Sequence, residues 1–341
     1  MKRRFATTAM ISTAALVLAA CSSDDAADAD TISVTTSIYP LQYVAQMVGG
    51  DQVAVTSITP PGSDDHSLEL SPRQVTDLEK VDLVVTLSGY QAAMDDAIAT
   101  TNPARVVDAA EHASLLDWET HVHDEDEEAA DHDHADDEHA EDTDHAEDEH
   151  AEDEHAHTDE AEDEAGHDHS GVDPHFWLDP VRLAGLAHPI AEELAEIDPE
   201  NAGTYRSNAD DLVAQLEDLD EDFSSGLNQC ESTTFVVSHA AFGYLAHAYD
   251  LTQESIAGLE IDTEPSPKRV AEVSALVDST GVDVIFATSE SEQSLVRALA
   301  EETGVRVDIL DAGATQVDES VDYDELMRTN LDKLQTALGC M

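Results

Sequence analysis

The order of apolar segments along residues 31–341 is the feature that most limits how this chain can fold. Two series of short β-rich runs alternate with amphipathic stretches, and one long helical pattern separates the series. The expected strands are 31–38, 53–59, 81–87 and 105–109, then 233–239, 254–259, 282–287 and 305–310. Helices are expected near 41–48, 72–79 and 91–100, then near 241–249, 267–279, 291–303 and 322–338. Such alternation predicts an α/β fold with two parallel-sheet units of about four strand–helix pairs each.

Two helical patterns lie between the series. The run VRLAGLAHPIAEELAEI (181–197) is expected as one helix. Apolar residues spaced by three and four then predict one long helix within 200–228, roughly 40 Å at about 1.5 Å per residue. The expected domains are an N-terminal lobe (31–199), this linking helix and a C-terminal lobe (229–341). Ligands of open α/β sheets bind beyond the carboxyl ends of the strands, so a site is expected in a cleft between the lobes.

The first 30 residues have the pattern of a processed leader. A basic start, MKRR, precedes the apolar run FATTAMISTAALVLAA, and LAAC places Cys21 at a small-residue cleavage site. This pattern resembles a bacterial lipobox, which implies a signal peptide over 1–20, a lipid on Cys21 and a flexible stalk over 21–30. An ordinary signal peptide with a chance cysteine is the alternative. Either reading puts the mature protein outside the cytoplasmic membrane, and the lipid would be its only membrane attachment.

The charge of the chain excludes some partners. With 77 acidic against 14 basic residues, the formal net charge is −63, which repels nucleic acids and anionic lipid head groups and attracts cations. Residues 121–170 hold 11 of the 17 histidines and no Lys or Arg. We expect this segment to be a disordered loop that gathers metal ions weakly, although a solvated spacer is the alternative. The histidines expected to bind there are His132, His134, His139, His145, His150, His155, His157, His167 and His169.

Two cysteines remain after the leader. In an oxidising compartment Cys230 and Cys340 can pair, and this pairing is the expectation, although two cysteines in so long a chain could also stay apart.

The histidines outside the acidic segment fall into two groups. One group lies at or beyond strand ends, where the cleft is expected: His66, His175 and His239. The other group is expected to be ordinary surface or core: His188 and His247 within helices, and His112 in the run after a strand. A carboxylate, Asp311, ends the last expected strand. Three imidazoles and one carboxylate form a tetrahedral ligand set well suited to zinc.

Five segments resemble the substrate-binding proteins of zinc and manganese ABC uptake systems. They are PGSDDHSLELSP, DPHFWLDP, DPENAGTYRSNADDLVAQL, SHAAFGYLAHAY and GLEIDTEPSPKRVAEV, in the family's order, from about residue 31 to the end. The resemblance implies two Rossmann-like lobes, a rigid connecting helix and a metal ion in the cleft. It also implies a monomer that delivers Zn²⁺ to an ABC permease, with His66, His175, His239 and Asp311 as ligands.

Position 239 bears on the choice of metal. Manganese-specific relatives have Glu where this chain has His239, and a third imidazole favours Zn²⁺ over Mn²⁺. Three further carboxylates are expected as supporting groups or alternative ligands. Asp65 stands where the family commonly has Pro, and Asp179 could accept the second N–H of His175. Glu290 lies near Thr288, which occupies a position where relatives often place an acid.

Other functions remain as alternatives. A manganese- or iron-binding homologue and a metal-binding surface adhesin both fit a lipid anchor and an acidic loop. A zinc hydrolase would fit three histidines and a carboxylate, but the sequence has no H-E-x-x-H, no G-x-S-x-G and no Cys–His nucleophile pair. The chain is therefore expected not to be an enzyme.

Overall fold

The structure is a computed structural model that describes residues 31–63, 65–117, 171–259, 266–290 and 292–341. Four sequence-based predictions fall outside these residues: the signal peptide, the lipid on Cys21, the stalk and the metal-gathering histidines of 121–170. Residues Ile32–Met341 form one compact unit.

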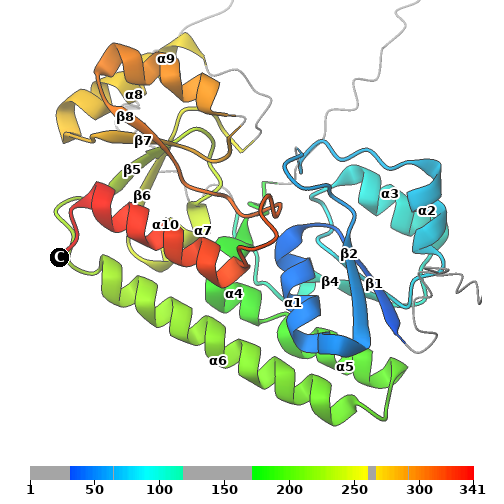
Figure 1. Ribbon diagram of the computed structural model, residues 1–341. Coiled ribbons are helices and arrows are strands. Elements are labelled where there is room, and N and C mark those ends of the chain that lie inside the picture. The colour runs from blue at the N-terminus through cyan, green and yellow to red at the C-terminus, as the bar shows by residue number, and fades with distance from the viewer. Residues whose placement is uncertain (1–30, 64, 118–170, 260–265, 291) are drawn as a thin grey trace, which may run out of the picture. The chain divides into compact units, whose positions relative to one another are not determined.

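Two parallel four-stranded sheets form the frame of this unit (Figure 1). The first contains β1 (Ile32–Thr36), β2 (Val53–Ser57), β3 (Leu83–Thr86) and β4 (Val106–Asp108), in the order β2-β1-β3-β4. The second contains β5 (Thr234–Val237), β6 (Thr252–Ser255), β7 (Val284–Ala287) and β8 (Arg306–Ile309), in the order β6-β5-β7-β8. In each sheet the second strand along the chain lies on one side of the first, and the third and fourth lie on its other side, as in doubly wound folds. The predicted α/β fold class is confirmed.

Helices cover both faces of the first sheet because its central strands are apolar on both sides. Leu83 and Val85 of β3 pack on the side of α1 (Tyr39–Gly49), whereas Val84 packs under α2 (Pro72–Leu78) and α3 (Ala92–Thr101). A continuous apolar run of this kind is what a parallel strand buried on both faces requires. The short turns η1 (Gly50–Gln52) and η2 (Ala109–Glu111) follow α1 and β4.

The second sheet repeats this arrangement. Ile285 and Ala287 of β7 pack under α8 (Pro267–Thr280) and α9 (Gln293–Thr303). Val284 and Phe286 face the opposite side, where they join the main hydrophobic core. That side also holds α7 (Gly243–Ala248) and α10 (Tyr323–Leu338).

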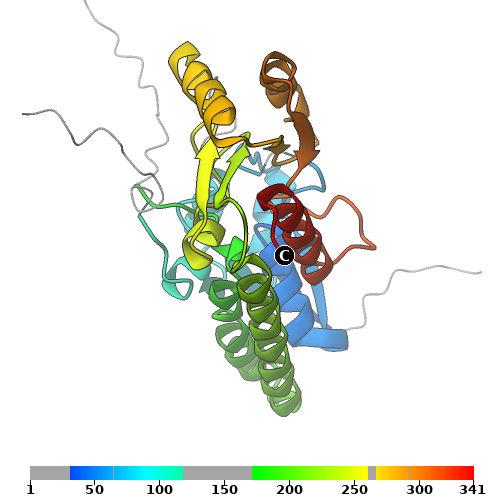
Figure 2. The same cartoon turned by 90° about the vertical axis from the view of Figure 1, so that its left-hand side faces the viewer.

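The long helix α6 (Ala202–Leu227) connects the two halves. It packs against α1, α4 and α5 of the first half and α10 of the second, and it runs along both (Figure 1). Figure 2, seen from the end of the second half, shows α6 below α10. Its buried residues recur every three or four positions: Tyr205, Ala209, Leu212, Leu216, Leu219, Phe223 and Leu227. These residues belong to one core cluster that also contains residues of both sheets, so the halves share a single main core.

The helix expected over 181–197 is in fact two helices. α4 (Pro180–Ala184) ends at Gly185, and α5 (Ala187–Ile197) begins two residues later. Pro189 lacks the N–H that a continuous helix would need, and its ring would clash with the carbonyl of Gly185. Gly185 also comes so close to its neighbours that a Cβ would lie 3.1 Å from the carbonyl oxygens of Arg182 and His112. A side chain at this position would require these carbonyl groups to move by a few tenths of an ångström.

Strand β6 begins two residues before the expected start. The expectation followed the apolar residues Ile256 and Ala257, but the ladder with β5 pairs the polar run Thr252–Ser255. β6 is an edge strand, and backbone pairing rather than burial decides where it lies.

Cys230 and Cys340 form a disulfide. Each lies just beyond a helix end, Cys230 after α6 and Cys340 after α10. The bond therefore joins the ends of two helices that also pack against each other. In the part of the chain that the structure describes, no helix combines the length and apolar character that crossing a bilayer requires.

Candidate metal centre

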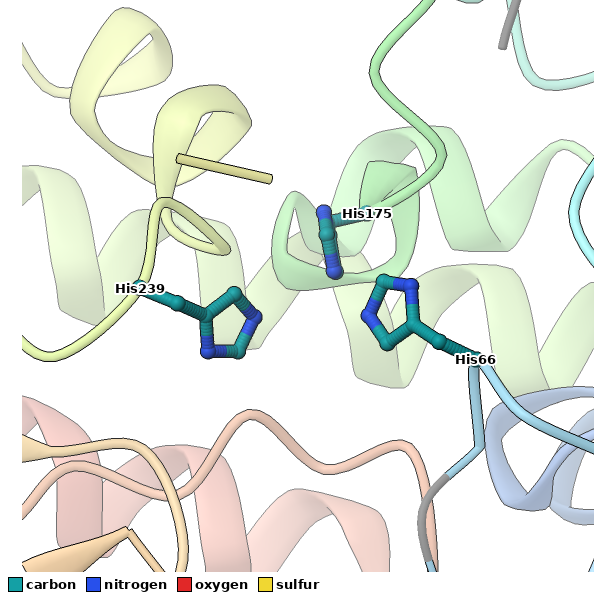
Figure 3. A group of neighbouring side chains, drawn as sticks. All are labelled: His66, His175 and His239. Atoms are coloured by element: carbon teal, nitrogen blue, oxygen red, sulfur yellow. The ribbon is translucent and has the colours of Figure 1, made fainter. Parts of the chain in front are cut away.

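The structure brings together the three histidines that were expected at strand ends. One ring nitrogen from each of His66, His175 and His239 lies within 4.8 Å of the corresponding nitrogens of the other two. The ring centroids are 5.5 Å apart for His66 and His175, 5.5 Å for His175 and His239, and 5.9 Å for His66 and His239. Figure 3 shows the rings converging on one point from separate segments. His175 and His239 are only 1% and 3% exposed.

His66 lies in the loop between β2 and α2, and its neighbour Asp65 fixes this loop. The carbonyl oxygen of Asp65 accepts a hydrogen bond from Nε2 of Gln91 (2.7 Å), which also donates to Oγ1 of Thr59 (3.0 Å). The buried Asp65 carboxylate accepts a hydrogen bond from the hydroxyl of Tyr90. Asp65 thus anchors the His66 loop through its hydrogen bonds with Gln91 and Tyr90.

His175 precedes the short turn η4 (Phe176–Leu178), and a buried carboxylate orients its ring. Oδ1 of Asp173 lies 2.8 Å from Nδ1 of His175 and also accepts from the backbone N–H of His175 at 2.9 Å. Asp173 is completely buried. A carboxylate on Nδ1 fixes the ring orientation and leaves Nε2 as the ligand atom.

Asp179, expected beside the ring of His175, instead caps α4. Its carboxylate accepts from the backbone N–H of Val181 (3.0 Å) and from Nε of Arg182 (3.0 Å). Burial raises the pKa of Asp179, and its hydrogen bonds and the Arg182 charge oppose that rise. The η4 turn places Asp179 at the N-terminus of α4, away from the imidazole of His175. Asp173, two residues before His175, contacts the ring nitrogen that Asp179 was expected to contact.

His239 follows β5, and a group of hydroxyls and a carboxylate surrounds its Nδ1. That nitrogen lies 2.7 Å from Oγ1 of Thr288 and 3.4 Å from Oε2 of Glu292. Burial opposes ionisation of Glu292, but a hydrogen bond from His239, the positive charge of that ring when protonated, and hydrogen bonds from Ser238 and Thr288 outweigh it and lower the pKa of Glu292 to about 2. Among the described residues, the buried Nε2 of His239 has no hydrogen-bond partner.

Asp311 and Glu290 line the same cavity as the three histidines, a space of about 760 Å³. Oδ1 of Asp311 accepts from the backbone N–H of Gly313 (2.9 Å), and burial raises the pKa of Asp311 against the effects of that bond and of Lys333. Neither carboxylate belongs to the group of ligand atoms within 4.8 Å of one another. The remaining three described histidines are exposed and outside the group: His112, His188 and His247.

Two carboxylates near the histidines escaped the sequence analysis. Asp173 could have been noticed, because it stands two residues before His175 in the same motif. Glu292 could not, because it lies 53 residues after His239 and reaches Nδ1 only through the fold of the β7–α9 loop.

Hydrogen bonds between the two halves lie close to the histidines. Nε1 of Trp177 donates to the carbonyl of Ala312 at 2.8 Å, and the backbone N–H of Tyr39 donates to Ala314 at 3.0 Å. The backbone N–H of Gly62 donates to Oγ1 of Thr315 at 3.2 Å. The segment after β8 is therefore fastened to the half that supplies His66 and His175.

The arrangement has the chemistry of a divalent-cation site. Imidazole nitrogens are borderline-soft ligands, and three of them with one open position match the preference of zinc for four nitrogen, sulfur or oxygen ligands. Because two of the rings engage neighbours through Nδ1, their Nε2 atoms remain for a metal ion.

Two known proteins with similar sequences are named for zinc binding or zinc uptake. The chain is 28% identical to the zinc-binding lipoprotein AdcA of Streptococcus pneumoniae over 331 residues, which cover 96% of this chain and 59% of that protein. It is 27% identical to the high-affinity zinc uptake system protein ZnuA of Bacillus subtilis over 335 residues, covering 95% and 94% of the two chains. The chain thus spans little more than half of AdcA but nearly all of ZnuA.

Solved structures of metal-binding or adhesin proteins superpose on this chain over most of its length. The AdcAII protein of Streptococcus pneumoniae superposes with a TM-score of 0.70 at 25% identity, covering 91% of this chain and 100% of that one. The laminin-binding protein Lmb of Streptococcus agalactiae, described as having adhesin and metal-transporting activity, superposes with a TM-score of 0.68 at 26% identity. It covers 90% of this chain and 99% of that one. The family model for the periplasmic zinc-uptake complex component A, ZnuA, matches residues 34–337, so the chain belongs to the ZnuA family.

Proposed function

We propose that this protein captures Zn²⁺ outside the cytoplasmic membrane and delivers it to an ABC permease. The observation that supports this most is the convergence of His66, His175 and His239 within 4.8 Å. They come from both halves of the molecule, so one ion bound to all three would join the halves. Membership of a zinc-uptake family supports the transport role.

Zinc is favoured over manganese because the third ligand is an imidazole. Manganese prefers harder oxygen ligands, and the group that converges here supplies three nitrogens. In this proposal Asp311 approaches as the fourth ligand when the ion binds, since it lines the same cavity. The shared core along α6 and the hydrogen bond between Trp177 and Ala312 limit the approach of Asp311 to a small shift.

Adhesion is a second candidate, supported by the likeness to Lmb. Binding of the zinc-free protein to immobilised laminin would support adhesion, and absence of binding would leave transport as the single candidate. Hydrolysis is set aside, because the relatives compared above are named for zinc binding, zinc uptake or adhesion. In the transport proposal the protein acts as a monomer, held at the membrane surface by a lipid on Cys21.

The segment 121–170 is proposed to collect zinc weakly and pass it to the three histidines. Removing it should leave the rest of the fold intact, because its flanks are already joined. Asp117 and Val172 form an antiparallel bridge, and the N–H of Asp173 donates to the carbonyl of Leu116 at 3.1 Å.

Zinc titration of the intact protein and of a variant lacking residues 121–170 tests both proposals. We expect the intact protein to bind several zinc ions and the shortened one to keep a single tight ion. The lost ions should also be those released below about pH 6.5, since protons then compete for imidazole. Equal stoichiometry in the two proteins would refute the gathering role. Loss of every tight site, with the fold retained, would refute the site at the three histidines.

A further inference from the structure

The surroundings of Nδ1 of His239 differ from those of Nδ1 of His175. Behind His175 stands a carboxylate in direct contact, Asp173. Behind His239 the nearest group is the hydroxyl of Thr288 at 2.7 Å, and a carboxylate, Glu292, lies beyond it. This second arrangement contains enough hydrogen-bonding groups to determine which nitrogen of His239 holds its proton.

The count of protons begins at Glu292, whose ionised carboxylate can only accept hydrogen bonds. Its Oε1 lies 2.7 Å from Oγ1 of Thr288, and its Oε2 accepts from the hydroxyl of Ser238. The hydroxyl of Ser289 lies 3.2 Å from Oε1. Each hydroxyl has one proton, so Thr288 donates its only proton to Glu292.

Thr288 must then accept from His239. With its proton committed, Oγ1 has only lone pairs to offer to Nδ1 at 2.7 Å, so Nδ1 must hold the imidazole proton. A neutral imidazole with a proton on Nδ1 has its lone pair on Nε2. That Nε2 is buried and has no hydrogen-bond partner among the described residues.

We propose that Thr288 and Glu292 form a hydrogen-bond relay that fixes the tautomer and orientation of His239, so that Nε2 faces the zinc ion. This role for the relay rests on the proposed zinc site, but the tautomer of His239 can be observed without zinc. Glu292 is a positioning residue in this account. Its Oε2 lies 3.4 Å from Nδ1, the nitrogen that does not face the proposed ion.

The test replaces Thr288 in the full chain. Thr288→Val removes the hydroxyl at nearly constant shape, and Thr288→Ser retains it. Thr303→Val is the matched control, because it makes the same change near the end of α9, where the hydroxyl donates only to the Leu299 carbonyl (2.8 Å). Glu292→Ala tests the far end of the relay, since Thr288 would then be released to donate to Nδ1.

Two measurements are made on each variant. Nitrogen-15 NMR of the zinc-free protein, with the His239 signal assigned by its loss in His239→Gln, reports which ring nitrogen holds the proton. Competition with a chelator reports the zinc Kd. We expect Nδ1–H in the wild type, mixed tautomers and a zinc Kd raised about 10- to 100-fold in Thr288→Val and Glu292→Ala, and recovery in Thr288→Ser. Thr303→Val should match the wild type.

The relay is wrong if wild-type His239 holds its proton on Nε2, or if Thr288→Val keeps both the wild-type tautomer and the wild-type Kd. Failure of the wild type to bind zinc would instead refute the proposed function. In that case the tautomer in the zinc-free protein still decides about the relay.

Discussion

Replacement of His239 by alanine is expected to weaken zinc binding by a factor on the order of 10² to 10³. Structural zinc sites with four ligands bind with roughly 10 to 16 kcal/mol, or about 2.5 to 4 kcal/mol per ligand, and each 1.4 kcal/mol is about tenfold. His239 is also the member of the histidine group that comes from the second half of the molecule. Its loss therefore removes a ligand and leaves the second half without an imidazole on the ion.

The matched control is His188→Ala. His188 lies on α5 with a side chain 57% exposed, and its Nε2 is 3.7 Å from Asp210. It undergoes the same chemical change without touching the three clustered histidines. Chelator competition should give a wild-type Kd for this variant. The assignment of His239 fails if its variant binds zinc as tightly as the control does, or if both variants lose affinity equally.

Removal of the disulfide is expected to lower the free energy of unfolding by about 4 kcal/mol. The bond between Cys230 and Cys340 closes a loop with a sequence separation of 110, and a loop of about that length restricts the unfolded chain by roughly 4 to 5 kcal/mol. The double variant Cys230→Ser, Cys340→Ser should therefore unfold at lower denaturant concentration than the wild type. Its free energy of unfolding should also depend more steeply on denaturant, because the unfolded chain without the cross-link is less compact and exposes more surface.

Reductant supplies the control for this experiment. Reducing the wild type should bring its unfolding curve to that of the double variant, whereas the double variant should not respond. Zinc affinity should stay near wild type in both, because the cysteines follow the far ends of α6 and α10 and do not line the cavity. A double variant as stable as the oxidised wild type would show that the bond does not stabilise the fold.

Periodicity was sufficient to predict most of the fold. The central strands have long apolar runs because both of their faces are buried, as Leu83 and Val84 of β3 illustrate. The pattern failed where backbone geometry decides the structure. It did not reveal the break at Gly185, and it shifted β6 toward Ile256, because the edge strand itself is polar.

The site shows the same division. His66, His175 and His239 could be singled out because chain order places them at strand ends, where parallel sheets bind ligands. The groups behind the rings could not, because their roles depend on the direction of single side chains in loops. Asp179 and Asp173 are equally plausible partners of His175 in the sequence, and only the η4 turn decides between them.

X-ray absorption at the zinc edge can show whether one zinc ion is held by three histidines, using the protein that lacks residues 121–170 and is loaded with one equivalent of zinc. We expect a four-coordinate ion with three imidazole nitrogens at about 2.0 to 2.1 Å. A first shell of oxygen atoms without the multiple-scattering pattern of imidazole would contradict it.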